Sequence, residues 1–359
     1  MKDKIKFIDL FAGIGGFHIA MHAYGAECVF ASEIDKFARQ TYEHNFKNIS
    51  PELFQKGNFN EDITDERLDY SSIPDFDVLC AGFPCQPFSH AGLKKGFDDT
   101  RGTLFFNIKE IVKAKIQGNK INPKVKVPKV LLLENVKGFK NHDKGNTYKV
   151  VEETLINLGY SVKSEVLNSK NFGVPQNRER IFIVAWYNSQ VDVKDFIFPL
   201  GLDNENNPIY SKIETVSKIK DTRVGDILLS KNELEDIEEK TQKAYTISEK
   251  LWEGHKRRRR EHAKKGNGFG YSLFKDDSPY TSTISARYYK DGSEILIEQD
   301  GKRPRKLHPL EAGRLQGYPI DEWYEIPVSD LQAYRQFGNS VSIPVVKTLA
   351  SEIIKQLLK

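Results

Sequence analysis

Five short apolar runs, separated by amphipathic stretches, constrain the fold of this chain more than any other feature of its sequence. The runs are Lys6–Leu10, Cys28–Ser32, Val78–Ala81, Val130–Glu134 and Ile181–Trp186. Strands that are apolar on both faces are typical of a parallel sheet buried between helices. The amphipathic stretches are Gly16–Tyr24, Lys36–Phe46, Thr103–Lys115 and Thr147–Leu158. This alternation predicts an α/β fold with a mostly parallel sheet that is covered on both faces.

Polar and glycine residues follow directly after these runs, where ligands of such sheets bind. In the segment Phe7-Ile-Asp-Leu-Phe-Ala-Gly-Ile-Gly-Gly-Phe17 the glycines allow tight turns and a close approach to a ligand. Glu33 follows the second run, where a carboxylate can accept from ribose hydroxyls, and Asp62 can accept from an adenine amino group. The glycine spacing differs from the dinucleotide pattern and argues against NAD, and the glycines alone also fit a purely structural turn.

Cys85 lies in the segment Ala81-Gly-Phe-Pro-Cys-Gln-Pro-Phe-Ser89, between two prolines and just past an apolar run. A thiol held in such a stiff loop is a candidate nucleophile. Cys28 and Cys80 are interpreted as inert buried thiols. Three cysteines are too few for a disulfide framework, and none lies in a zinc-binding pattern, so we predict no metal site.

Charged side chains also stand at the ends of the last two runs. Glu134 ends a wholly apolar run, where a carboxylate is costly unless it is paired or protonated. It could therefore be an acid with a raised pKa, or it could serve as an ion-pair or capping residue. Gln176, Arg178 and Arg180 alternate before the last run, and this period of two predicts that they share one face and need anionic or carbonyl partners.

The character of the chain changes after Pro199. Residues 200–300 are polar and rich in turns, which predicts a second, smaller domain of mixed structure. Basic residues gather at 256–260, with two more lysines at 264 and 265; such a cluster suits a polyanion, or it is a solvated helix face. The amphipathic stretch Val345–Leu358 is expected to pack on the first domain. The predicted boundaries are 1–188, 189–300, a return segment 301–334 and a terminal segment 335–359.

Composition sets broad limits. Of 359 residues, 39% are hydrophobic and 29% charged, as in ordinary soluble proteins. No stretch reads as a signal peptide or a membrane span, so we expect a cytoplasmic protein without a membrane partner. Nothing in the sequence predicts a stable oligomer, and a monomer is expected.

Taken together and in this order, these segments resemble the cytosine-5 DNA methyltransferases. The resemblance also includes Asp99-Thr-Arg-Gly-Thr-Leu-Phe105, Glu134-Asn-Val, Gln176-x-Arg-x-Arg180, Arg305-Lys-Leu through Arg314-Leu-Gln-Gly317, and Gln336-Phe-Gly-Asn-Ser-Val341. It covers nearly the whole chain apart from residues 190–280. It implies a Rossmann-like domain that binds S-adenosylmethionine and a smaller target-recognition domain within residues 189–300.

The resemblance also implies roles for single residues. Cys85 would add to carbon 6 of cytosine, Glu134 would hydrogen-bond to or protonate N3, Arg180 would orient the base, and Arg178 would support the site. The residues implied for the S-adenosylmethionine pocket are Phe11, Ala12, Gly13, Gly15, Gly16, Glu33, Ile34, Asp62, Ile63, Gly82, Pro84, Leu104, Asn339, Ser340 and Val341.

The implied partner is duplex DNA, from which the target cytosine must be flipped out. The variable region is similar to those of bacterial modification enzymes that recognise CCGG or CCWGG, which act beside a separate restriction endonuclease. Two alternatives remain at this point: an RNA cytosine-5 methyltransferase, and a DNA-binding regulator without catalysis.

Overall fold

The computed structural model describes residues 4–84, 104–191, 196–212, 217–266, 268 and 270–359, and Cys85 lies outside this part. The chain forms two compact units. Unit 1 comprises residues 1–167, 179–200 and 345–359, and unit 2 comprises 168–178 and 201–344. The chain therefore passes between the units four times, and each unit is built from separate stretches of sequence.

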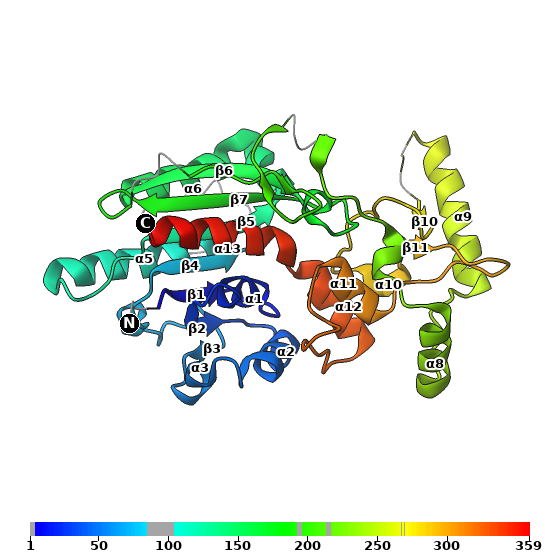
Figure 1. Cartoon of the computed structure of the whole chain (residues 1–359), viewed down its shortest axis with the longest axis horizontal. Coiled ribbons are helices and arrows are strands. Elements are labelled where there is room, and N and C mark those ends of the chain that lie inside the picture. Colours follow the sequence, from blue (N-terminus) through cyan, green and yellow to red (C-terminus); the bar gives the residue numbers. More distant parts are fainter. Residues whose placement is uncertain (1–3, 85–103, 192–195, 213–216, 267, 269) are drawn as a thin grey trace. The chain divides into compact units, whose positions relative to one another are not determined.

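Unit 1 contains a seven-stranded sheet in the order β3-β2-β1-β4-β5-β7-β6 (Figure 1). The strands are β1 (Lys6–Leu10), β2 (Glu27–Ser32), β3 (Phe59–Asn60), β4 (Val78–Gly82), β5 (Val130–Val136), β6 (Tyr160–Asn168) and β7 (Glu179–Tyr187). Neighbours among β1 to β5 are parallel, and β7 runs antiparallel to β5. The predicted α/β fold with a mostly parallel sheet is confirmed.

Helices follow the strands as the amphipathic stretches predicted. They are α1 (Gly16–His22), α2 (Lys36–Phe46), α3 (Pro51–Gln55), α5 (Leu104–Ile121), α6 (Asn146–Asn157) and α13 (Ile343–Leu357). Asp35 caps α2 by accepting hydrogen bonds from the amides of Phe37 and Ala38, at 2.9 and 3.0 Å. The α5 helix runs past its predicted end at Lys115, a buried residue whose ammonium donates to the carbonyl of Ile73.

The core of unit 1 explains why the strands could be predicted from the sequence. Apolar side chains of β1, β4 and β5 are almost completely excluded from solvent, because helices cover the sheet. The α13 helix lies against the sheet in Figure 1, drawn in red. Its buried side chains recur along one face: Val345, Val346, Leu349, Ala350, Ile353 and Ile354. None of the described helices is long and apolar enough to cross a membrane.

Asp9 is the next-to-last residue of β1, and its carboxyl group is completely buried. Burial, with the nearby charge of Glu33, raises the pKa of Asp9 well above its ordinary value. A raised pKa in the folded state means that this group favours folding at low pH, and that its contribution is lost as the pH rises through the folded-state pKa.

We therefore expect Asp9→Asn to gain stability relative to the parent protein as the pH rises. The gain should approach about 1.4 kcal/mol for each pH unit between the pKa of Asp9 in the unfolded chain and its raised pKa in the folded protein, and it should level off above the latter. Urea unfolding of both proteins at pH 5, 7 and 8.5 measures this difference. An equal difference at all three pH values would contradict the assignment.

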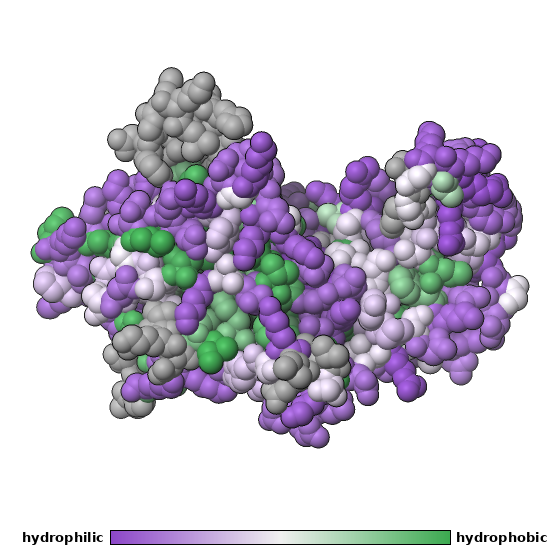
Figure 2. Space-filling model, turned by 90° about the horizontal axis from the view of Figure 1, so that it is seen from above, coloured by the Kyte–Doolittle hydropathy of each residue, from purple (hydrophilic) through white to green (hydrophobic). Residues whose placement is uncertain are grey.

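Unit 2 is built from short elements. They are η4 (Ser169–Phe172), β8 (Gly201–Leu202), β9 (Pro208–Ile209), η5 (Val224–Ile227), α8 (Lys231–Thr241), α9 (Glu249–Lys264), β10 (Leu273–Phe274), α10 (Tyr288–Asp291), β11 (Leu296–Ile297), α11 (Pro309–Leu315) and α12 (Asp330–Asn339). Hydrophilic residues dominate the face of the molecule in Figure 2, and hydrophobic residues there form small separate patches.

A buried ion pair stabilises the centre of unit 2. The side chain of Glu311 is fully buried. Its carboxylate accepts hydrogen bonds from Nη1 and Nη2 of Arg305, at 2.7 and 2.8 Å. The same carboxylate accepts from the backbone amides of Leu229 and His308, at 2.8 and 2.7 Å. Four hydrogen bonds therefore satisfy this buried carboxylate.

The two units divide the chain differently from the predicted boundaries. The expected return segment 301–334 and residues 335–344 belong to unit 2, because contacts such as the Arg305–Glu311 pair join them to it. Residues 168–178, expected in the first domain, also belong to unit 2. Only residues 345–359 of the expected terminal segment belong to unit 1.

Candidate active site

The carboxyl ends of the parallel strands bring the acidic and glycine residues of unit 1 to one edge of the sheet. Asp62 follows β3, Glu33 follows β2, Gly13 follows β1, and Gly82 ends β4. Because the strand order is β3-β2-β1-β4-β5, these residues succeed one another along that edge and Glu134 on β5 comes next. The order along the chain reverses between β1 and β4, where ligands bind in sheets of this kind.

The glycine loop after β1 is fixed by the carboxylate of Glu33. One oxygen accepts from the amide of Gly13 at 2.8 Å, and the other accepts from the amide of Asp35 at 2.7 Å. Burial raises the pKa of Glu33. Phe11 has a φ of +54°, which is uncommon for a residue other than glycine. The loop is therefore held in a strained, defined conformation.

Two glycines in this loop have different roles. Gly15 has a φ of +87°, and a β-carbon there would lie 2.1 Å from the ring of Phe46, so packing alone requires glycine. Gly13 has a φ of +54°, and no atom lies within 4 Å of the place of its β-carbon. The space beside Gly13 is open, which allows a ligand to approach the backbone.

The other pocket residues implied by the resemblance are distributed over both units. Ile34 is 67% exposed after β2, whereas Ile63 is buried. Asp62 is half-buried, and one of its oxygens accepts from the amide and hydroxyl of Thr64 at 2.8 and 2.7 Å. Ala12 is buried in the loop, and Gly16 is buried at the start of α1. Pro84 is exposed after β4, and Leu104 begins α5. Asn339, Ser340 and Val341 lie in unit 2.

Glu134 and Arg180 form an ion pair near the end of β5. The Nε of Arg180 lies 3.1 Å from an oxygen of Glu134, and the two side chains are 17% and 11% exposed. Antiparallel pairing of β5 with β7 places Arg180 opposite Val136, two residues beyond Glu134. A β-carbon at Gly82 would lie 3.6 Å from the other oxygen of Glu134, so the carboxylate lies against the end of β4.

This pairing decides how charge is balanced in the site. Burial lowers the pKa of Arg180, and the charge of Glu134 opposes that shift. The guanidinium in turn stabilises a carboxylate that would be costly to bury alone. A buried acid and a largely buried cation thus lie together next to the strand that leads to Cys85. The predicted proton-donating form of Glu134 stays a prediction.

Asn135 is a site residue that sequence reasoning quoted in a motif but did not assign. Its buried amide donates to the carbonyl of Phe83 at 2.9 Å, and its side-chain oxygen accepts from the amide of Val136 at 2.8 Å. It therefore joins the end of β5 to the backbone just before Pro84. A wholly apolar strand that ends in an acid and an amide was the signal for such a role.

We expect Asn135→Ala to lower kcat about 10- to 100-fold, because the backbone that carries Cys85 loses its anchor to β5. The free energy of unfolding should fall by about 1–2 kcal/mol, which is the usual effect of leaving a buried carbonyl unpaired. Asn119→Ala is the matched control, since the Asn119 amide donates to the carbonyl of Val125 at 2.6 Å at the far end of α5. An equal loss of kcat in both variants would contradict a specific role for Asn135.

Arg178 belongs to unit 2, whereas Arg180 belongs to unit 1. The buried guanidinium of Arg178 donates to the backbone carbonyls of Ile284, Gly338 and Ser340, at 3.1, 3.2 and 2.6 Å. Gln176 is also buried. Its side-chain amide donates to the carbonyl of Leu315, and its side-chain oxygen accepts from the backbone amide of Ile284. The expected carbonyl partners are present, and they make Arg178 a residue that positions backbone.

The remaining candidates concern cysteines and metals. Cys28 and Cys80 are buried free thiols, and burial raises the pKa of both. This environment agrees with inert thiols. Among the described residues no group of histidine, cysteine or acidic side chains could hold a metal ion.

The fold and this edge define the class of protein: an α/β enzyme with a ligand site at the carboxyl ends of parallel strands. The family model described as C-5 cytosine-specific DNA methylase matches residues 5–355. The chain therefore belongs to this family and is a DNA (cytosine-5-)-methyltransferase.

Individual relatives agree over almost the full length. The chain is 49% identical to the type II methyltransferase M.NlaX of Neisseria lactamica, over 97% of this chain and 96% of the relative. It is 39% identical to M.HhaI of Haemophilus parahaemolyticus, over 98% and 96% of the two chains. The crystal structure of the S. pombe Dnmt2 methyltransferase superposes with a TM-score of 0.64 at 20% identity and covers 99% of this chain and all of that one, a likeness of fold.

Proposed function

We propose that this protein transfers a methyl group from S-adenosylmethionine to carbon 5 of a cytosine that is flipped out of duplex DNA. The observation that carries the proposal is the Glu134–Arg180 pair beside the end of β4, the strand that leads to Cys85. A type II modification enzyme, acting beside a separate restriction endonuclease, fits the names of the relatives.

The residues after β1 and β2 fit S-adenosylmethionine. The open side of Gly13 leaves room for a ligand against the backbone, and the exposed Ile34 offers an apolar surface at the same edge. Asp62 has a half-buried carboxylate that can accept from an amino group. The resemblance implies Phe11 and Pro84 for the same ligand, and it also implies Asn339 and Ser340. When bound, S-adenosylmethionine supplies an electrophilic methyl group on a sulfonium.

The chemistry assigned to the chain's own residues begins with a covalent bond. The Cys85 thiolate bonds to carbon 6 of cytosine, and the electron pair of the 5,6 double bond moves toward carbon 5 and N3. Glu134 holds a proton or hydrogen bond at N3, and Arg180 donates to the base carbonyl, so both stabilise the charge that develops. After carbon 5 has taken the methyl group, loss of its proton restores the double bond and expels Cys85. Arg178 acts by holding backbone of unit 2.

Bisulfite sequencing of a plasmid treated with the purified protein and S-adenosylmethionine tests this function. We expect one protected cytosine within each CCGG or CCWGG site and unprotected cytosines elsewhere. Omitting S-adenosylmethionine is the control and should abolish protection. The proposal fails if no cytosine in duplex DNA is protected, and methylation of tRNA in a parallel reaction would then identify RNA as the substrate.

A further inference from the structure

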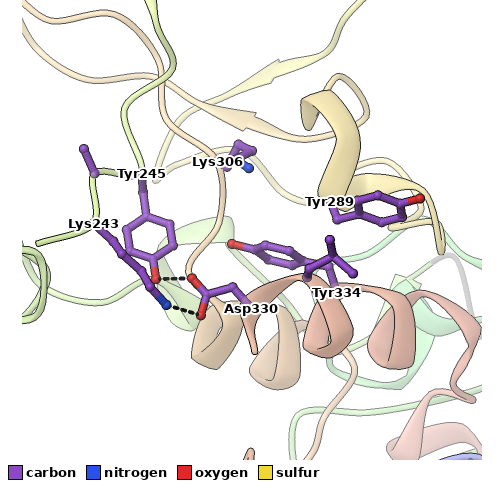
Figure 3. Close-up of a pocket in the computed structure, with 8 residues that line it drawn as sticks. Lys243, Tyr245, Tyr289, Lys306, Asp330 and Tyr334 are labelled. Atoms are coloured by element: carbon purple, nitrogen blue, oxygen red, sulfur yellow. Dashed lines mark hydrogen bonds and ion pairs between the residues drawn. The ribbon is translucent and has the colours of Figure 1, made fainter. Parts of the chain in front are cut away.

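Unit 2 has a cavity of about 350 Å³ that is separate from the sheet edge described above. Figure 3 shows it between α10, α12 and the segments that carry Lys243 and Lys306. The lining residues are Lys243, Ala244, Tyr245, Tyr289, Lys306, Asp330, Leu331 and Tyr334. Two lysines, one aspartate and three tyrosines make this a polar cavity with a net positive charge.

The only carboxylate among the lining residues is already satisfied. The ammonium of Lys243 lies 3.0 Å from one oxygen of Asp330, and the hydroxyl of Tyr245 donates to the other oxygen at 2.9 Å. Burial alone would raise the pKa of Asp330, but these two hydrogen bonds lower it. Asp330 is therefore a carboxylate neutralised by Lys243, and the second lysine is left over.

Lys306 is the unbalanced charge. Its ammonium lies 5.6 Å from the centre of the Tyr334 ring, and within the described residues it makes no ion pair. Burial lowers the pKa of Lys306. Gly292 has a φ of +65°, and a β-carbon there would lie 2.6 Å from the Cγ of Lys306, so its backbone packs closely against the lysine stem. The ammonium is thus held in place without an anionic partner.

Tyrosines also line the cavity that holds this ammonium. In Figure 3 the ring of Tyr334 lies below Lys306, with Tyr289 on one side and the Asp330 group on the other. The Tyr334 hydroxyl is occupied, because it donates to the carbonyl of Leu307 at 2.5 Å. Tyr289 is half-buried on α10, and in Figure 3 its hydroxyl points away from Lys306. The Lys306 ammonium, which carries three N–H donors, is therefore the group in this cavity that fits the oxygens of a phosphate group.

The α10 helix also connects this cavity to the basic helix α9. Asp291, at the end of α10, pairs with Arg258 at 3.0 Å, and its backbone carbonyl lies 3.1 Å from the Nε2 of His255. Arg258, one arginine of the basic cluster at 256–260, is therefore engaged in an ion pair within unit 2. Arg257 and Arg260 of the same cluster are exposed on α9. The helix that carries the basic cluster therefore contacts the helix that lines the cavity, and exposed arginines so close to it favour a polymer of phosphates over a single small anion.

We propose that this cavity binds a backbone phosphate of the DNA substrate, with the ammonium of Lys306 as its donor. The inference rests on the proposed function, because it takes DNA as the polymer. It assigns to Lys306 a phosphate contact, which positions the duplex without reading its sequence.

The test measures binding of full-length protein to duplex DNA with and without the target site, between 50 and 400 mM NaCl. We expect Lys306→Gln to weaken binding to both duplexes roughly fivefold at low salt. The slope of log affinity against log salt should become shallower by about 0.9, the loss of one phosphate contact. Lys306→Arg should retain both values.

Asp330→Asn is expected to change DNA binding in the opposite direction to Lys306→Gln. Removing this carboxylate frees Lys243, so binding should tighten and the salt slope should steepen, which misfolding cannot produce. Lys231→Gln, at the exposed start of α8, is the matched control and should leave affinity and slope unchanged.

Two results would overturn the proposal: an unchanged salt slope in Lys306→Gln, or an equal change in Lys231→Gln. Titration with dCMP separates the two sources of phosphate, since tight binding of the mononucleotide with an unchanged DNA slope would assign the cavity to a free nucleotide. If the parent protein bound DNA but did not methylate it, the proposed function would fail while this binding test remained decisive.

Discussion

Cys85→Ala is expected to abolish methyl transfer, lowering kcat by about 10⁴-fold or more, while duplex binding stays within about threefold of the parent. The expected loss is large because the proposed reaction has no other nucleophile to make carbon 5 reactive, and losses of this size follow removal of covalent nucleophiles in enzymes. Binding should survive because the phosphate contacts belong to other residues. Single-turnover methylation and a binding titration on the same preparation measure the two quantities.

Cys80→Ala is the control for a cysteine substitution close in sequence. Its thiol is buried in β4, and burial raises its pKa, so it cannot serve as the nucleophile. Activity should stay within about threefold of the parent. A duplex that contains 5-fluorocytosine should form a covalent adduct with the parent and with Cys80→Ala, and none with Cys85→Ala. Normal turnover in Cys85→Ala would remove this residue from the mechanism.

Glu311→Ala is expected to destabilise unit 2 by about 4 kcal/mol, because the change leaves the guanidinium of Arg305 buried without its partner. Two backbone amides, those of Leu229 and His308, also lose their acceptor. For a unit of this size such a loss lowers Tm by about 10 °C. Thermal unfolding followed by circular dichroism measures the shift.

Unit 2 also contains an exposed pair of the same kind, which serves as the control. Arg314 binds both oxygens of Asp321, and the Asp321 side chain is 62% exposed. Asp321→Ala should cost less than about 1 kcal/mol, because water replaces the lost contacts. Combining Arg305→Met with Glu311→Gln should recover more than half of the stability, since no unpaired charge remains and the amides keep an acceptor. Equal losses in both single variants would contradict burial as the cause.

The strands of unit 1 were predictable from the sequence because burial on both faces leaves continuous apolar runs. Lys6–Leu10 and the helix Lys36–Phe46 have the predicted bounds. By contrast, β6 has mostly half-buried residues and polar side chains, so it carries no apolar run. The division into units was also hidden, because it depends on contacts between residues far apart in the chain, such as the pairing of Gln176 with Leu315.

The candidate site was predictable one residue at a time, and its pairings were not. The sequence placed Glu134 and Arg180 at strand ends, but their contact follows from the antiparallel register of β5 and β7. The period-two spacing of Arg178 and Arg180 predicted that they share one face, whereas the chain passes from unit 2 to unit 1 between them. No pattern in the sequence predicted the cavity that holds Lys306, because its lining residues come from four separate stretches of sequence.

The repeated passage of the chain between its units limits how the protein can be engineered. A graft that exchanged only residues 201–344 for those of a relative would leave the native segment 168–178 to bond with foreign backbone, since Gln176 and Arg178 hold Ile284, Gly338 and Ser340. Chimeras designed to acquire a new sequence preference should therefore transplant both stretches as one set, and splice the polypeptide at the four crossings.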